Sequence, residues 1–217
     1  GTLFPYTTLF RSSLEKLADY VGERKTIAKA DVKSVLKRTK TDPIYELTNA
    51  VADRNVGQAL FYAQSLLNGS DPIHPLQIIA ALGNQTRSLL IIKNFMNSKY
   101  GTSWKPGIRF DSFKNKVAPD VERYDAEIRE QIDQRDKILK DNTADKKKKA
   151  SSTSMVIAAN PRNLYPIYKK FEKAANFSEN ELLRALNLLR IVDLQLKTTA
   201  KDHRLVLDHL IIAICRQ

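Results

Sequence analysis

Large apolar side chains recur at helical spacing along most of the chain. In residues 76–96 they keep a period of about 3.6 residues, so they fall on one helix face. They are Leu76, Ile79, Leu82, Leu89, Ile92 and Phe95. This pattern predicts a long amphipathic helix, and similar stripes predict further helices over 13–38, 44–53, 56–67, 160–177, 179–199 and 203–216. The sequence therefore predicts an all-α fold.

Polar and turn-forming residues separate these helices. Asp42-Pro43 precedes the helix that begins near residue 44, and proline suits a first helical turn. The sequence "SENE" at 178–181 has the pattern of a capping box, in which Ser178 caps the helix start and Glu181 reaches back to it. These signals predict that helices begin near residues 44 and 179.

Residues 97–154 break the regular pattern. Their first part, 97–117, contains glycine, proline and aromatic residues without a period, and 118–140 predicts a highly charged helix. Residues 141–154 are of low complexity and include four consecutive lysines, 146–149. We interpret the block as an insertion in a helical domain, with the lysine run in a solvated loop rather than at a phosphate site.

The composition favours a helical protein and bears on its partners, on disulfide bonds and on membrane spans. Only 7 Gly and 8 Pro occur among 217 residues, and the net charge is +12. A basic surface favours a nucleic-acid or acidic-protein partner. Cys215 is the single cysteine, so no intrachain disulfide can form. The longest apolar stretch, 205–215, is interrupted by Asp208 and His209, which argues against a transmembrane helix.

No pattern of catalytic, metal or cofactor chemistry stands out. The chain has neither a glycine-rich phosphate loop nor an H-E-x-x-H motif. His203 and His209 are six residues apart and fall on different helix faces, while His74 lies between prolines in an expected loop. Cys215 follows isoleucines and is expected in the core, without a nearby cation to activate it. We therefore expect no catalytic residue, metal site or cofactor.

Asp193 is an exception on the apolar face of the helix over 179–199. On a helical wheel it lies within about 20° of Leu182. Arg190 and Lys197, at i−3 and i+4, can reach its carboxylate, and an unpaired buried carboxylate would be costly. We interpret the three residues as a structural ion pair rather than as a general acid or base.

The last two helices carry apolar residues on more than one side. Leu188, Ile191 and Leu194 lie away from the Leu182 face, and the helix over 203–216 is apolar nearly all round. Such helices need neighbours on several sides. Two arrangements fit, a subunit of a helical assembly and a central helix of a monomeric bundle.

The ending "ENELLRALNLLRIVDLQLKTTAKDHRLVLDHLIIAIC" resembles the C-terminus of the bacterial DNA polymerase III delta subunit family. The family pattern "(A/V)D..LK" is matched from Val192 to Lys197, and its last helix by Leu207 to Cys215. Upstream, residues 14–36 resemble the end of the family's lid domain, and 44–67 resemble the start of its collar. Residues 75–96 resemble the family's long helix, with the matching positions Gln85, Arg87 and Lys93.

This resemblance implies a domain organisation. Residues 13–40 would be the end of an AAA+ lid helical domain, and 41–217 a helical-bundle collar domain that carries the insertion 97–154. Residues 1–12 resemble a translated sequencing-adapter remnant, so we leave them out of the fold. We expect the chain to be the C-terminal part of something larger.

The resemblance also implies a function in DNA replication. The delta subunit belongs to the clamp loader, which places the sliding clamp on primed DNA, and its collar assembles with the gamma/tau and delta-prime subunits. Contact with the clamp belongs to the family's N-terminal domain, and ATP turnover belongs to other subunits. The family is part of a polymerase holoenzyme, so whether the chain counts as an enzyme stays open. A bacterial cytoplasmic location without membrane contact is expected.

Two other interpretations remain open from the residues. A free-standing basic helical nucleic-acid-binding domain would suit the net charge, and an enzyme with an unrecognised site would need a perturbed carboxylate near His203 or His209. Candidate DNA contacts under either replication or nucleic-acid binding are Arg162, Lys169, Lys170, Lys173 and Lys201.

Overall fold

The computed structural model describes residues 18, 20–22, 24, 26, 43–69, 72–142, 155–158, 163–198 and 202–216. Residues 1–12, nearly all of 13–40, the lysine run 146–149, and the candidate DNA contacts Arg162 and Lys201 lie outside this part. All regular elements within it are helical, which confirms the predicted all-α class. None of its helices combines the length and the apolar character needed to span a membrane.

The main helices follow the predicted order. They are α3 (Pro43–Ala52), α4 (Val56–Asn68), α5 (Pro75–Asn97), α7 (Ala118–Asn142), α8 (Leu164–Ala175), α9 (Glu179–Thr198) and α10 (His203–Cys215). Between α5 and α7 lie three short elements: the 3-10 helix η1 (Gly101–Ser103), α6 (Phe110–Ser112) and the π-helix η2 (Phe113–Val117). The charged helix predicted over 118–140 is therefore present as α7.

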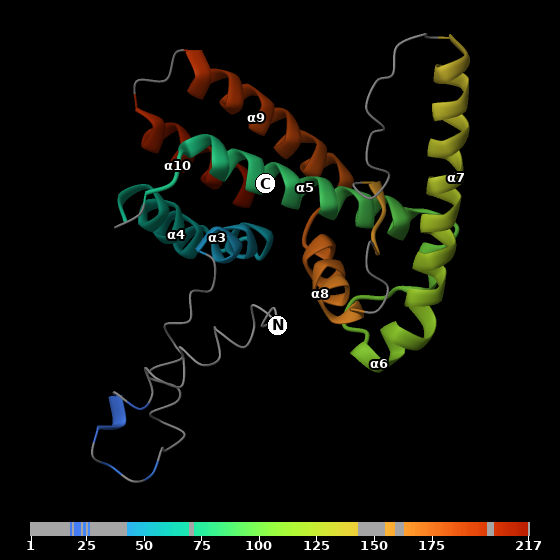
Figure 1. The fold of residues 1–217 in the computed structure, drawn as a ribbon, viewed down its shortest axis with the longest axis horizontal. Helices are drawn as coiled ribbons and strands as arrows, with labels where there is room; N and C mark the ends of the chain where they lie inside the picture. The colour runs from blue at the N-terminus through green and yellow to red at the C-terminus, as the bar shows by residue number, and fades with distance from the viewer. Residues whose placement is uncertain are drawn as a thin grey trace, which may run out of the picture.

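The long helix α5 is the axis of the fold. It packs against α9, α8 and α3, and α10 packs in turn against α4, α9 and α3. Figure 1 shows α3, α4, α9 and α10 gathered along one part of α5, with α8, α6 and α7 towards its other end. His74 lies in the loop before α5, as expected, and also caps that helix. Its Nδ1 accepts a hydrogen bond from the Leu76 amide at 3.2 Å.

Aromatic side chains fill the core where α5 meets α8. The ring of Phe171 on α8 lies 5.5 Å from that of Phe95, 5.1 Å from that of Trp104 and 5.1 Å from that of Phe113, measured between centroids. Trp104 and Phe113 come from the block expected to be an insertion, so its first part belongs to the core. Of the predicted aromatic stripe on α8, Tyr168 and Phe171 are buried, whereas Tyr165 is exposed.

Phe171→Ala tests whether this aromatic cluster holds α8 to the core. Phe171 is fully buried, so its truncation removes apolar burial and leaves a cavity. We expect a loss of about 3–5 kcal/mol in the free energy of unfolding, measured by urea titration. Phe61→Ala, at an exposed phenylalanine on α4, is the control and should cost less than about 1 kcal/mol. Equal losses for the two variants would contradict a central role for Phe171.

Candidate assembly interface

Asp193 forms an ion pair at the rim of α9 rather than in its core. Its Oδ2 lies 2.6 Å from Lys197 Nζ, and the two side chains are 38% and 52% exposed, respectively. Arg190 donates instead to Asn187 Oδ1 at 3.3 Å. Of the ion pair predicted from the sequence, the structure therefore joins Asp193 and Lys197 but not Arg190. The wheel placed Asp193 near Leu182, but an open groove of about 290 Å³ between α5 and α9 leaves its carboxylate accessible.

The lysines of α8 make contacts within the fold. Lys169 Nζ lies 2.7 Å from Glu172 Oε2, and this hydrogen bond raises the pKa of Lys169. Lys170 donates to Ser88 Oγ of α5 at 3.2 Å, and burial lowers the pKa of Lys170. Lys169 and Lys170, both predicted DNA contacts, are therefore engaged by Glu172 and Ser88.

Lys173, the third lysine of this group, is also enclosed by the fold. Its side chain is 15% exposed, and its ammonium lies 3.6 Å from Asp53 Oδ2. It also donates a hydrogen bond to Asn49 of α3. Lys173 therefore fastens α8 to α3 and has little surface to offer a phosphate.

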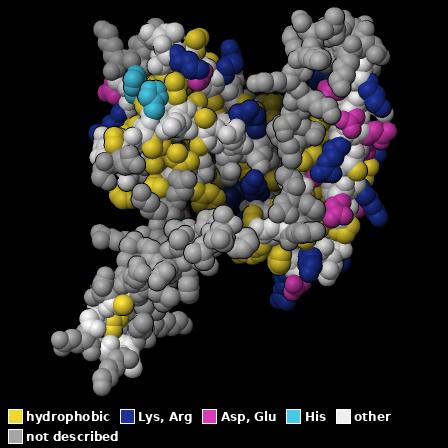
Figure 2. Space-filling view, in the orientation of Figure 1, with side chains coloured by type: hydrophobic (Ala, Val, Ile, Leu, Met, Phe, Trp, Pro, Cys, Tyr) yellow, Lys and Arg dark blue, Asp and Glu magenta, His cyan; other side chains and the backbone are white. Residues whose placement is uncertain are grey.

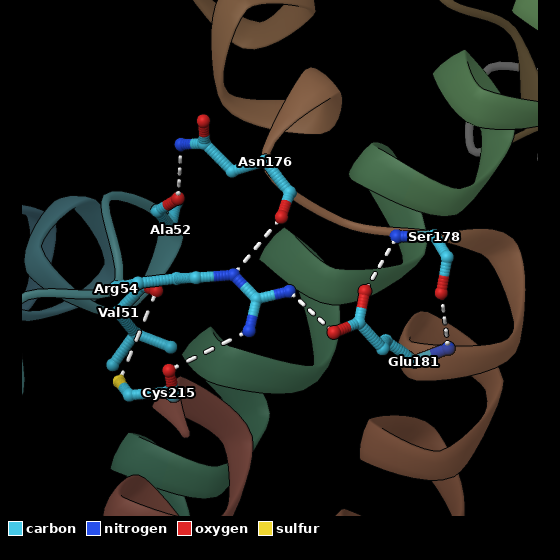
Figure 3. A network of polar contacts seen from close by, with 7 residues as sticks. All are labelled: Val51, Ala52, Arg54, Asn176, Ser178, Glu181 and Cys215. Atoms are coloured by element: carbon cyan, nitrogen blue, oxygen red, sulfur yellow. Dashed lines mark hydrogen bonds and ion pairs between the residues drawn. The ribbon is translucent and has the colours of Figure 1, made fainter. Parts of the chain in front are cut away.

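Arg54 occupies the turn between α3 and α4 and joins three parts of the fold (Figure 3). Its Nε donates to the Asn176 carbonyl at 2.9 Å, and its Nη1 donates to the Cys215 carbonyl at 3.5 Å. Its Nη2 donates to Glu181 Oε1 at 2.7 Å. The guanidinium also lies 4.2 Å from the centroid of the Phe177 ring. One side chain thus connects the α3–α4 turn, the α8–α9 turn and the end of α10.

Glu181 completes this network from the first turn of α9. The predicted capping box is confirmed, because Glu181 Oε2 accepts from the Ser178 amide at 2.6 Å and the Glu181 amide donates to Ser178 Oγ at 3.2 Å. The hydrogen bond from the Ser178 amide, followed by that from Arg54, lowers the pKa of Glu181 to about 2. The capping pattern indicated Glu181, but no sequence signal indicated that Arg54 would be its partner.

Cys215 lies in the core as expected. Its Sγ is 4.0 Å from the Val51 carbonyl oxygen, and burial raises the pKa of the thiol to about 11. A thiol with such a pKa is protonated at neutral pH and is a poor nucleophile. Within the described ranges, no group of three or more histidine, cysteine or carboxylate side chains is placed to hold a metal ion.

Exposed apolar side chains on α9 form the strongest candidate for a functional surface. Leu183, Ile191 and Leu194, which we call the α9 outer stripe, are 48%, 39% and 60% exposed. Helical geometry places them within an arc of about 80°, opposite the side that packs on α5. Arg184 and Arg190 lie exposed on either edge of this arc. The exposed Asn187 falls within the same arc, so the surface is apolar with one amide inside it and arginines at its edges, which suits a protein–protein contact.

Other exposed apolar residues occur on the neighbouring helices. Phe61 on α4 and Leu205 on α10 are 68% and 52% exposed. Figure 2 shows hydrophobic side chains gathered over α4 and α10 on the face in view. The last helices are therefore apolar on more sides than the described part of the chain covers, as the sequence predicts.

The pH dependence of stability should reveal the contacts of Glu181 with the Ser178 amide and with Arg54. The folded-state pKa of Glu181, about 2, is below the ordinary value of 4.5, so its charge stabilises the fold above pH 4.5. This stabilisation is lost as the pH falls towards 2. Glu181→Gln should lower the urea midpoint at pH 7, and the difference from the parent should shrink steadily below pH 4.5. Glu122→Gln, on the exposed side of α7, is the control. A deficit independent of pH would refute a charge-based role.

Asp193→Leu tests the structural interpretation of the exposed ion pair. Exposed pairs contribute about 0–1 kcal/mol, so we expect a change below about 1 kcal/mol in the free energy of unfolding. Leu182→Ala, in the buried face of the same helix, should cost about 2–5 kcal/mol and serves as the positive control. A loss for Asp193→Leu as large as that control would show that the carboxylate carries the packing of α9.

The comparisons with known proteins agree with the resemblance seen in the sequence. No protein-family model matches the chain. The DNA polymerase III subunit delta of Bacillus subtilis is 29% identical over 204 residues, which cover 94% of this chain and 44% of that protein. The Bacillus subtilis DNA clamp loader delta protein has a similar structure, with a TM-score of 0.54 and 21% identity over 97% of this chain and 46% of that one. The chain spans just under half the length of these relatives, and its similarity to a delta subunit is confirmed.

Proposed function

We propose that the chain is the collar-bearing part of a bacterial clamp-loader delta subunit and that its role is assembly of the loader. Similarity to a delta subunit over 94% of the chain supports the family, and the α9 outer stripe supports the role. Residues 13–40 would be the end of the lid, and 41–217 the collar. The site of action would be the bacterial cytoplasm, where the loader places the sliding clamp on primed DNA.

The observation that carries the assembly role is the exposure of three large aliphatic side chains on one helix face. Leu183, Ile191 and Leu194 leave apolar area in water, and burying it in a contact releases roughly 25 cal/mol per Å². Arg184 and Arg190 at the edges would give the contact its orientation. We propose that gamma/tau or delta-prime collars cover this surface, and that contact with the clamp belongs to the N-terminal domain of the family.

The described side chains do not favour intrinsic catalysis. The Cys215 thiol is buried with a raised pKa, and Asp193 is paired with Lys197. We propose that this part of the subunit binds other subunits and that ATP turnover takes place elsewhere in the loader. The rival function, a free-standing nucleic-acid-binding domain, is weakened because Lys170 and Lys173 contact Ser88, Asn49 and Asp53.

Leu194→Glu tests the assembly role. The side chain is 60% exposed, so the fold should tolerate glutamate, whereas a charge in an apolar contact would weaken it. When the chain is mixed with gamma/tau and delta-prime subunits, we expect the parent to co-elute in size exclusion. The variant should bind at least about tenfold more weakly by calorimetry.

Gln131→Glu, which adds the same charge to an exposed position of α7, is the matched control and should assemble as the parent does. Urea unfolding of both variants establishes that they are folded. Absence of any complex between well-folded components would contradict the assembly role. Tight, strongly salt-dependent binding of the isolated chain to DNA would favour the nucleic-acid-binding alternative.

A further inference from the structure

A second surface lies along the outward side of α5. An open groove of about 640 Å³ separates this side of the helix from the segment 155–157. Its walls include Arg87, Ile91 and Asn94 from α5, and Met155, Val156 and Ile157 from the facing segment. We call it the α5 groove, and it uses none of the residues of the α9 outer stripe.

Arg87 is the one charged residue among the described residues that line the α5 groove. Among the described residues that line it, none is an aspartate or a glutamate. Arg87 donates to the Gly83 carbonyl and to Asn84 Oδ1, both at 3.1 Å, and both acceptors are neutral. Lys170 donates to Ser88, another residue of the same wall. Figure 2 shows basic side chains in the hollow between the helical bundle and α7.

The ammonium of Lys170 is partly desolvated, so its interaction with an approaching anion is strengthened. Burial lowers the pKa of Lys170, and no carboxylate among the described residues offsets that effect. A partly desolvated ammonium whose acceptor is a neutral hydroxyl is stabilised when an anion approaches it. Arg87 in the lining, together with Lys170 bound to the lining residue Ser88, makes the groove electrostatically complementary to a carboxylate-bearing ligand.

The opposite wall of the groove, residues 155–157, is apolar and is hydrogen-bonded to α7. Asp125 of α7 is 1% exposed, and its carboxylate accepts hydrogen bonds from the Ile157 and Ala158 amides at 2.9 and 2.8 Å. These bonds fix the segment that forms this wall against α7. Met155 at the rim is 55% exposed, and its flexible thioether can adapt to different aliphatic shapes.

We propose that the α5 groove binds an acidic, leucine-rich segment of a partner protein. Carboxylates of that segment would lie against Arg87, and its aliphatic side chains would pack on Ile91 and Val156. Nε and Nη2 of Arg87 already donate to Gly83 and Asn84, so a carboxylate would approach Nη1 and the second hydrogen of Nη2, while the arginine stem packs against apolar groups. This binding is separate from the collar contact proposed for α9, so either can fail without the other.

The test uses the full chain and three synthetic peptides of equal length. In the first, pairs of glutamates alternate with pairs of leucines, and in the others lysine or glutamine replaces every glutamate. Fluorescence anisotropy should show saturable binding of the glutamate peptide alone. Arg87→Glu should weaken that binding by about tenfold or more, because it replaces attraction with repulsion. Arg123→Glu, at an exposed arginine paired with Asp120 on α7, should bind within about twofold of the parent.

Asn94→Asp provides a second variant that leaves the Arg87 contacts intact. It places a carboxylate in the groove wall and should also weaken the glutamate peptide. The proposal is overturned if the lysine or glutamine peptide binds as tightly as the glutamate peptide, if no peptide binds, or if both groove variants bind like the parent. Tighter binding of single-stranded oligothymidine, with displacement of the glutamate peptide, would make the groove a nucleic-acid site and overturn it too.

Discussion

The guanidinium of Arg54 is the contact on which the arrangement of the helices depends. It satisfies the Cys215 carbonyl at the end of α10 and the Asn176 carbonyl after α8, while it pairs with Glu181 at the start of α9. The last carbonyls of a helix lack partners within that helix, and a cation there also opposes the negative end of the helix dipole. One residue in a turn therefore closes two helix ends and positions a third helix.

This closure explains how α9 can be apolar on two sides without disrupting the fold. The Ser178–Glu181 capping box and Arg54 fix the start of α9, so that Leu182 and Leu189 face α5. The outer side, with Leu183 and Leu194, then faces solvent. A helix oriented by polar contacts at its end can keep a second apolar side available for another subunit.

The sequence predicted the features that depend on local spacing. The long helix α5, the charged helix α7 and the capping box at Ser178 all follow from patterns within a few turns. The pairing of Arg54 with Glu181 joins residues 127 positions apart, and no local pattern encodes it. Trp104 follows the 3-10 helix η1, and Phe113 begins the π-helix η2. The sequence around them therefore lacks the α-helical period. The helical wheel predicted a buried position for Asp193, whereas its side chain is 38% exposed. A helical wheel describes one helix and does not show where the neighbouring helix leaves a groove.

The basic residues behind the net charge of +12 occupy two kinds of position in the fold. Lys170 and Lys173 lie at helix junctions, where they contact a hydroxyl, an amide and one carboxylate. Arg87, Arg184 and Arg190 lie instead beside apolar surfaces on α5 and α9. Basic charge next to exposed leucine and isoleucine suits protein partners with acidic, aliphatic surfaces better than a bare phosphate backbone, because such partners neutralise the charge and cover the apolar area together.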